Sequence, residues 1–260
     1  MNNIIIFLSH IINEETIARC NKIYREMSDA YTIYWVTTET NSGALSRIPT
    51  YIKVFPVSSK DIQGMGYTPI TSNIWGSVNF IIQFFFKNNP QYDNYWVIEY
   101  DVIFTGNWKT FLDTSDHIQA DLLSSHIEFY SHSNREWEWW KWSRWNEKNN
   151  YSVESYVKSF NPIYRMSAAA LSFMDCFMRE GNSGHFEALI ATALYNNGYK
   201  LVDFGGYGEF VPHGFENKYY VKGSGTNNGT IRYRPLYLQQ EIKALGIADK
   251  LFHPVKFETY

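Results

Sequence analysis

The sequence is short of cysteine, of excess charge and of long hydrophobic runs. Its 260 residues include 2 cysteines, which excludes a disulfide framework and is typical of a reducing compartment. A formal net charge of −3 excludes the basic surplus with which proteins bind nucleic acid, so we expect no nucleic-acid partner. The longest apolar stretch, Phe80–Phe86, is far shorter than the ~20 residues that span a bilayer.

An export signal is also absent from the first residues of the chain. The segment Met1–His10 has no basic region, and its apolar run is too short for the hydrophobic part of a signal peptide. Five or six apolar residues between polar ones are typical of a buried first strand instead. We therefore expect a cytoplasmic protein, and peripheral contact with a membrane stays open.

Aromatic residues, in contrast, are abundant. Phe, Tyr and Trp make up 18% of the chain, with 9 Trp and 20 Tyr. Aromatic side chains offer flat apolar faces that carry a polar group. Sugar rings, nucleobases and membrane interfaces all use such faces, so the excess narrows the partners without choosing among them.

Strand-like and helix-like segments alternate along the first half of the chain. Strands separated by helices imply crossover connections, and hence an α/β fold with a mostly parallel sheet covered by helices. The expected strands are Ile4–Leu8, Tyr31–Thr37, Ile52–Val57 and Tyr95–Ile98, and the expected helices are Asn13–Met27 and Ser72–Lys87.

The second half is less regular but shows no linker and no repeat. We expect a single domain, in which about residues 1–110 and 111–260 form two halves. Gly205–Gly229, rich in Gly, Asn and Tyr, is predicted to be irregular. The other expected elements are strands at Asp121–Ser125, Pro162–Met166 and Leu201–Val202, and helices at Ala168–Arg179 and His185–Asn196.

Two carboxylates follow the fourth expected strand. Glu99 and Asp101 are separated by one residue, and in an extended chain such residues point to the same side. The carboxyl ends of strands line the ligand crevice of open α/β sheets, and oxygen ligands suit Mg²⁺ or Mn²⁺. The pair therefore predicts a site for one hard cation, or for a cation and a ribose hydroxyl. Two ordinary acids at a solvated strand end remain the alternative.

Two further groups carry chemistry. His185 and Glu187 begin an apolar helix, whose dipole favours an ionised Glu187 that acts as a base or binds a sugar hydroxyl. Support of the helix start is the alternative for Glu187. Near the C-terminus, His253 offers a metal ligand and Lys256 a point charge for phosphate, unless the histidine is structural or simply exposed.

The order of these motifs resembles that of a known family. The run Tyr95–Val102 with Thr105–Trp108 after it resembles the acid-x-acid region of nucleotide-sugar glycosyltransferases of the GT-A type. The segments Gly184–Glu187 and Gly198–Gly206 resemble the acceptor side of such enzymes, and Arg232–Pro235 with His253–Lys256 is similar to their tail. Bacterial enzymes that build capsule or O-antigen polysaccharide show the strongest likeness.

The resemblance implies a Rossmann-like GT-A fold and a Mn²⁺- or Mg²⁺-dependent hexosyltransferase. Its donor would be a nucleotide-diphosphate sugar, UDP-linked and of the galactose or glucose type, and its acceptor a glycan or lipid-linked glycan. Glu99 stands where Asp is more frequent. The roles implied are metal binding for Asp101 and His253, ribose or metal binding for Glu99, diphosphate binding for Lys256, catalysis beside the acceptor for His185 and Glu187, and acceptor binding for Asp203. Topology adds Leu8, Ser9, Thr37 and Thr38 beside the nucleotide.

A cluster of five tryptophans lies in nine residues, Trp137–Trp145. On a helix these indoles would spread around the whole circumference, so the pattern is no narrow amphipathic stripe. We interpret Trp137 and Trp140 as an acceptor platform, with packing of a lid or contact with a membrane interface as alternatives. For the whole protein, the alternatives to a transferase are a non-catalytic carbohydrate-binding protein and a metal-dependent nucleotidyltransferase or hydrolase.

Overall fold

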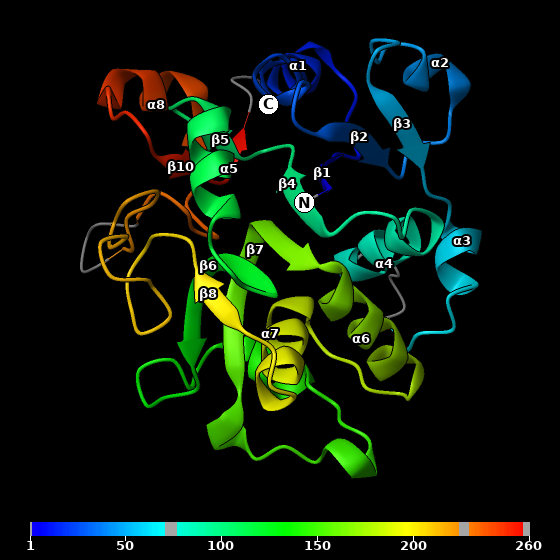
Figure 1. Cartoon of the computed structure of the whole chain (residues 1–260), viewed down its shortest axis with the longest axis vertical. Coiled ribbons are helices and arrows are strands. Elements are labelled where there is room, and N and C mark those ends of the chain that lie inside the picture. Colours follow the sequence, from blue (N-terminus) through cyan, green and yellow to red (C-terminus); the bar gives the residue numbers. More distant parts are fainter. Residues whose placement is uncertain (1, 71–76, 224–228, 257–260) are drawn as a thin grey trace.

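A seven-stranded sheet forms the centre of the molecule (Figure 1). The computed structural model describes residues 2–70, 77–223 and 229–256. The strand order is β3-β2-β1-β4-β7-β6-β8; β7 is antiparallel to both its neighbours, and all other pairings are parallel. The expected α/β fold with a mostly parallel sheet is thus confirmed. The strands are β1 (Asn3–Leu8), β2 (Thr32–Thr37), β3 (Lys53–Pro56), β4 (Asn94–Glu99), β6 (Leu122–Phe129), β7 (Val157–Ser167) and β8 (Leu201–Asp203).

Helices cover both faces of this sheet (Figure 1). On one face pack α3 (Ser59–Gln63), α4 (Val78–Asn88), α6 (Ala168–Arg179) and α7 (Phe186–Asn196). On the other face pack α1 (Glu14–Met27) and α5 (Trp108–Asp116). The other elements are α2 (Ser42–Leu45), α8 (Gln239–Leu245), the 3₁₀ helices Glu138–Trp142, Glu147–Asn149 and Val153–Ser155, and the short strands β5 (Ile103–Phe104), β9 (Tyr237–Leu238), β10 (Leu251–Phe252) and β11 (Val255–Lys256).

Alternation along β1 explains why both faces are covered. Ile4, Ile6 and Leu8 pack against the helices of one face, whereas Ile5 and Phe7 pack against those of the other. Successive side chains of a strand point to opposite faces, so a strand that is apolar at every position needs a cover on each side. The apolar run that predicted a buried strand therefore also required a layered fold.

Most of the expected elements are present, with shifted ends. The start predicted for the second helix, at Ser72, lies outside the described residues, and α4 begins at Val78. The strand predicted at Pro162–Met166 is much longer, because β7 begins at Val157. Pro162 has no N–H for a ladder, and the register between β6 and β7 is irregular, so the sequence pattern breaks where the strand continues. Gly205–Gly229 is irregular wherever it is described, as predicted.

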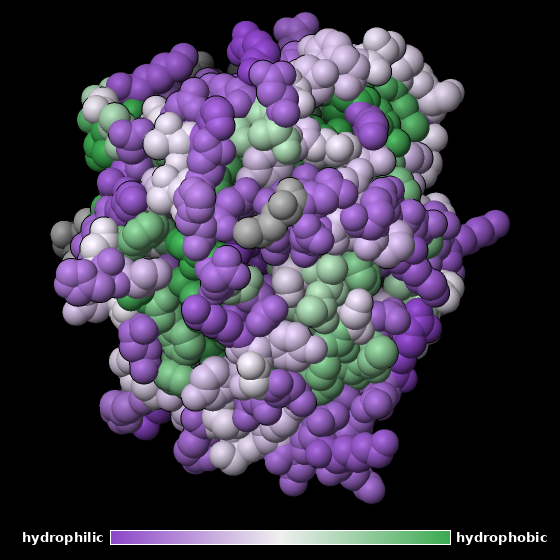
Figure 2. Space-filling view, in the orientation of Figure 1, coloured by the Kyte–Doolittle hydropathy of each residue, from purple (hydrophilic) through white to green (hydrophobic). Residues whose placement is uncertain are grey.

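None of the described helices is long and apolar enough to cross a membrane. On the face seen in Figure 2, hydrophilic side chains cover most of the surface and hydrophobic residues gather in small areas.

Candidate functional site

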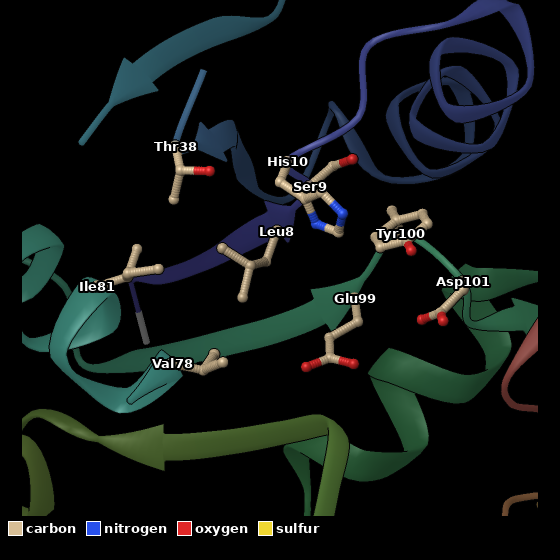
Figure 3. Close-up of a pocket in the computed structure, with 9 residues that line it drawn as sticks. All are labelled: Leu8, Ser9, His10, Thr38, Val78, Ile81, Glu99, Tyr100 and Asp101. Atoms are coloured by element: carbon tan, nitrogen blue, oxygen red, sulfur yellow. The ribbon is translucent and has the colours of Figure 1, made fainter. Parts of the chain in front are cut away.

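The carboxyl ends of β1, β2 and β4 surround a cavity of about 520 Å³, the first cavity (Figure 3). Its walls include four residues predicted to bind the nucleotide sugar: Leu8, Ser9, Thr38 and Glu99. Parallel strands bring their carboxyl ends to one edge, which is why residues far apart in the sequence meet there. The remaining lining residues are His10, Val78, Ile81, Tyr100 and Asp101.

Thr37 does not share this position. Its side chain is fully buried, and its hydroxyl accepts a hydrogen bond from the Glu39 N–H at 3.0 Å. The strand end thus points Thr37 into the protein and Thr38 into the cavity, as expected for consecutive residues of an extended segment.

Glu99, Asp101 and His253 converge beside the first cavity. The imidazole Nε2 of His253 lies 3.5 Å from Asp101 Oδ1 and 3.7 Å from Glu99 Oε2. One ligand atom from each residue can be chosen so that all three lie within 4.8 Å of one another. The two carboxylates thus lie close to a common point, and a histidine about 150 residues away joins them.

The hydrogen bonding of His253 leaves one ring nitrogen available as a ligand. Nδ1 lies 3.0 Å from the carbonyl oxygen of Arg232, which can only accept, so Nδ1 carries the proton. Burial lowers the pKa of His253, which keeps the ring neutral at pH 7. Nε2 therefore presents its lone pair to the carboxylates, in the arrangement typical of a metal-bound histidine.

The donor set fits a divalent cation such as Mn²⁺ or Mg²⁺. Asp101 is 5% exposed, and its Oδ1 has no hydrogen-bond partner among the described residues. Burial, together with the carboxylates of Asp101 and Glu187, raises the pKa of Glu99. Lys256 pairs with the other oxygen of Asp101, but a buried carboxylate oxygen without a donor, close to a second carboxyl group, would be stabilised further by a bound cation. Two carboxylate oxygens and one imidazole nitrogen are ligands that a divalent cation can share.

The C-terminal segment is held against the acid pair. The Val255 N–H donates to the Asp101 carbonyl at 2.8 Å, and Arg19 of α1 donates to the carbonyls of Tyr100 and Val255. Lys256 Nζ then lies 2.5 Å from Asp101 Oδ2 and 3.0 Å from the Tyr100 hydroxyl. Burial lowers the pKa of Lys256, but Asp101 and Tyr100 together raise it above its ordinary value, so the ammonium stays charged.

A second cavity, of about 240 Å³, lies on the other side of the acid pair. Six predicted site residues line it: Glu99, Asp101, His185, Glu187, His253 and Lys256. Three segments of the chain, the end of β4, the start of α7 and the C-terminal segment, therefore meet at one site, although the sequence separates them widely.

Glu187 is 7% exposed at the start of α7, and its Oε1 accepts the Asn161 N–H at 3.2 Å. Burial raises the pKa of Glu187 to about 8. The expectation that the helix dipole keeps this carboxyl ionised is wrong. The dipole contributes about 0.3–1 kcal/mol, whereas a shift of this size corresponds to several kcal/mol, at roughly 1.4 kcal/mol per pKa unit. At neutral pH Glu187 is mostly protonated and can donate a hydrogen bond.

His185 lies against Trp139. The two rings are stacked, with centroids 4.2 Å apart and an interplanar angle of 11°. Burial lowers the pKa of His185 to about 4, so the imidazole is neutral at pH 7. Its Nδ1 is 3.7 Å from Glu187 Oε2, which is too long for a direct hydrogen bond.

The tryptophan cluster is divided between core and cavity. Trp140 is 6% exposed, packs on Tyr130 and donates its indole N–H to the Asn134 carbonyl at 3.0 Å. It supports the short 3₁₀ helix from inside and is not placed to bind an acceptor. Trp137 and Trp139 instead line a third cavity, of about 400 Å³. The five indoles are not on an α-helix, so the helical spread expected for them does not arise.

Asp203, predicted to bind the acceptor, is inside the protein. It is fully buried at the end of β8, where Oδ1 accepts the N–H groups of Gly205 and Gly206 at 2.9 and 3.0 Å, and Oδ2 accepts the Tyr220 hydroxyl at 2.6 Å. A side chain on Gly206 would overlap the Tyr220 ring, since its Cβ would lie 1.8 Å from Cζ. The carboxylate therefore organises the loop after β8 and has no surface for an acceptor.

We expect Asp203→Ala to lower the free energy of unfolding by about 3 kcal/mol or more, because four buried donors lose their acceptor. Urea unfolding followed by circular dichroism measures this loss. Asp113→Ala, which removes an exposed carboxylate on α5, is the matched control and is expected to change the free energy by less than about 0.5 kcal/mol. Unchanged stability of Asp203→Ala together with a raised KM for an acceptor would instead support the acceptor role.

Several lining residues were not predicted from the sequence. Tyr100 stands between the two acids and reaches Lys256, while Asn161 lines the second cavity from the middle of β7. Tyr233 and Arg234 also line the second cavity, and their segment was noted in the sequence only for its resemblance to the C-terminal part of GT-A enzymes. The Asn161–Pro162 break in an apolar strand was the signal available for Asn161, since polar residues within buried strands mark irregular or functional positions.

No family model matches this chain, and no curated protein matches it. Among solved structures, it is similar to a galactosyltransferase, LgtC, in complex with donor and acceptor sugar analogues, at 8% identity and a TM-score of 0.47 over 95% of this chain and 79% of that one. Mouse xyloside xylosyltransferase 1 is similar at 9% identity and 0.43, over 78% and 84%. An inositol-1-phosphate CTP transferase from T. maritima is similar at 9% and 0.44, over 82% and 90%. All three TM-scores are below 0.5.

Proposed function

We propose that this protein is a metal-dependent glycosyltransferase that moves a hexose from a nucleotide-diphosphate sugar to a glycan or lipid-linked glycan acceptor. We further propose a UDP-linked donor of the galactose or glucose type and a role in surface polysaccharide synthesis, following the motifs that the sequence shares with such enzymes. Residues up to about 110 would form most of the nucleotide-sugar-binding half and the remainder most of the acceptor-binding half of one domain, with His253 and Lys256 reaching back to the donor.

The observation that carries this proposal is the convergence of Glu99, Asp101 and His253 between two cavities. The first cavity lies at the carboxyl ends of parallel strands, where α/β proteins bind nucleotides, and its walls include apolar side chains from Leu8 and Ile81. A diphosphate held at the cation would place the nucleoside in the first cavity and the sugar in the second.

The chemistry of glycosyl transfer matches the charges present. Breaking a glycosyl–phosphate bond leaves negative charge on the departing diphosphate, and a bound divalent cation stabilises that charge. Lys256, 2.5 Å from Asp101, is placed to bind the same leaving group. Glu187 holds a proton at neutral pH and can orient a sugar hydroxyl; with a pKa of about 8, it accepts a proton from an acceptor hydroxyl more readily as the pH rises.

A thermal shift assay with nucleotides and Mn²⁺ tests the proposal. We expect UDP with Mn²⁺ to raise Tm by several degrees, as ligand binding to the folded state requires, and EDTA to reverse the shift. Incubation with UDP-, GDP- and CMP-sugars is then expected to release a nucleotide. Release of pyrophosphate from a nucleoside triphosphate and a sugar phosphate would favour a nucleotidyltransferase. Glycan binding with no response to any nucleotide would favour a carbohydrate-binding protein.

A further inference from the structure

A third cavity, of about 400 Å³, adjoins the second. The two share four residues: Trp139, Phe160, Glu187 and Tyr233. A ligand that extends from the second cavity therefore passes directly into the third. Its volume is within the usual range of small-molecule sites, about 300–1,000 Å³.

Two lysines on one wall of the third cavity share a single carboxylate. Lys158 Nζ lies 3.4 Å from Glu128 Oε2, and Lys222 Nζ binds Glu128 Oε1. The side chains of Lys158 and Glu128 are less than one fifth exposed, and that of Lys222 is 39% exposed. One positive charge of this half-buried group is therefore not balanced by Glu128, which is unusual because buried charges are normally paired.

The guanidinium of Arg232 adds a cation without a carboxylate partner among the described residues. It donates to the carbonyl oxygens of Pro235 and Gly229 and to the Tyr237 hydroxyl, all of which are neutral. The acidic side chains that line the third cavity do not neutralise this positive charge. Glu187 is mostly protonated at pH 7, and Glu138 is exposed to solvent. Burial also keeps His126 neutral. The cavity thus has an excess of positive charge.

Aromatic faces form the rest of the binding surface. Trp137 and Trp139 line the cavity from the 3₁₀ helix side, and the largely exposed Tyr233 lines it from the opposite segment. Lys158 Nζ lies 5.4 Å from the centroid of the Trp137 ring. Indole and phenol rings next to cations suit a sugar ring that carries a negative substituent, because the ring stacks while its anion pairs with the ammonium groups.

We infer that the third cavity binds the acceptor, and that it selects an acceptor sugar bearing an anionic group, a carboxylate or a phosphate. This inference rests on the proposed function, because the third cavity can bind the acceptor only if the second cavity holds the transferred sugar. It adds a substrate class that the cation site does not specify. Lys222 and Lys158 are the residues that distinguish an acidic sugar from a neutral one.

The test compares matched probes that differ only in charge. Binding of methyl β-glucoside, methyl β-glucuronide and glucose phosphorylated at its primary hydroxyl is measured by titration calorimetry on the full chain. We expect at least one acidic probe to bind about tenfold more tightly than the neutral one, the gain typical of a charge-assisted hydrogen bond. Carboxylate and phosphate as the source of the charge are distinguished by which acidic probe gains.

Variants show whether the third cavity is responsible. Lys222→Gln is expected to abolish the preference for the acidic probe, whereas Lys60→Gln, an equal change on exposed α3, is expected to leave it intact. Glu128→Gln, which frees both lysines, is expected to strengthen it. Equal affinity for acidic and neutral probes, or a preference that survives Lys222→Gln, would overturn the inference. The response to UDP and Mn²⁺ is measured on the same samples, so a failed preference with an intact nucleotide response leaves the proposed function standing.

Discussion

Replacing Asp101 with asparagine is expected to remove the stabilisation by UDP with Mn²⁺ and to slow sugar transfer by about a thousandfold or more. A bound cation contributes several kcal/mol to the stabilisation of developing charge, and each ~1.4 kcal/mol corresponds to a factor of ten in rate. Asp101 lies at the centre of the site, since it faces His253 through Oδ1 and Lys256 through Oδ2. No other substitution in the site removes so much at once.

The choice of asparagine separates this effect from unfolding. The amide oxygen of asparagine can still accept the hydrogen bond from Lys256, so the C-terminal segment keeps this contact. The negative charge that attracts the cation is lost. Thermal unfolding without ligand, measured by calorimetry, should show a folded protein. Asp113→Asn, the same change at an exposed position, is the matched control and should retain full activity. If Asp101→Asn keeps more than about a tenth of the transfer rate, the metal role of Asp101 is rejected.

Glu187→Gln is expected to stabilise the protein in a pH-dependent manner. The pKa of Glu187 is raised from 4.5 to about 8 in the folded protein, so the folded state holds a proton that the unfolded state has lost between these values. The wild type therefore loses stability as the pH rises from about 4.5 to 8, by up to about 4 kcal/mol from this one group. Glutamine resembles the protonated carboxyl and can still accept the Asn161 N–H, so the variant escapes the loss.

Urea unfolding of the wild type and the variant at pH 5 and pH 8 measures this difference. The gain of Glu187→Gln is expected to be small at pH 5 and large at pH 8. Glu14→Gln, a surface change on α1, is carried through the same titration as control. A variant that is destabilised equally at both pH values would contradict the assignment of a protonated Glu187.

The same variant also tests catalysis. If Glu187 accepts the proton of the acceptor hydroxyl, the wild-type transfer rate rises with pH toward about 8, and glutamine lowers it by roughly a hundredfold or more. An unchanged pH profile of the residual activity would assign Glu187 to orienting a sugar hydroxyl. Together with the stability measurement, this separates what the buried carboxyl costs the fold from what it contributes to the reaction.

The local sequence pattern was sufficient to predict the strands of the sheet and part of the candidate site. A short apolar run such as Ile4–Leu8 is typical of a strand covered on both faces, and parallel strands bring their carboxyl ends to the same edge of the sheet. The prediction that Leu8, Ser9, Thr37 and Thr38 lie there followed from topology, and all of them except the buried Thr37 line the first cavity. The spacing of Glu99 and Asp101 placed both carboxylates on one side, because alternate residues of an extended chain share a side.

Three features depended on tertiary structure. His253 reaches the acid pair through backbone hydrogen bonds that the sequence does not reveal, among them the bond from Val255 of β11 to Asp101, about 150 positions away. Glu187 is protonated because α7 packs it into the protein, and burial outweighs the local helix dipole that the sequence shows. Asp203 and Trp140 are residue types that often bind sugars, yet both side chains are buried in the protein. Spacing along the chain decides which side a residue faces, whereas burial and pKa depend on what the rest of the fold places against it.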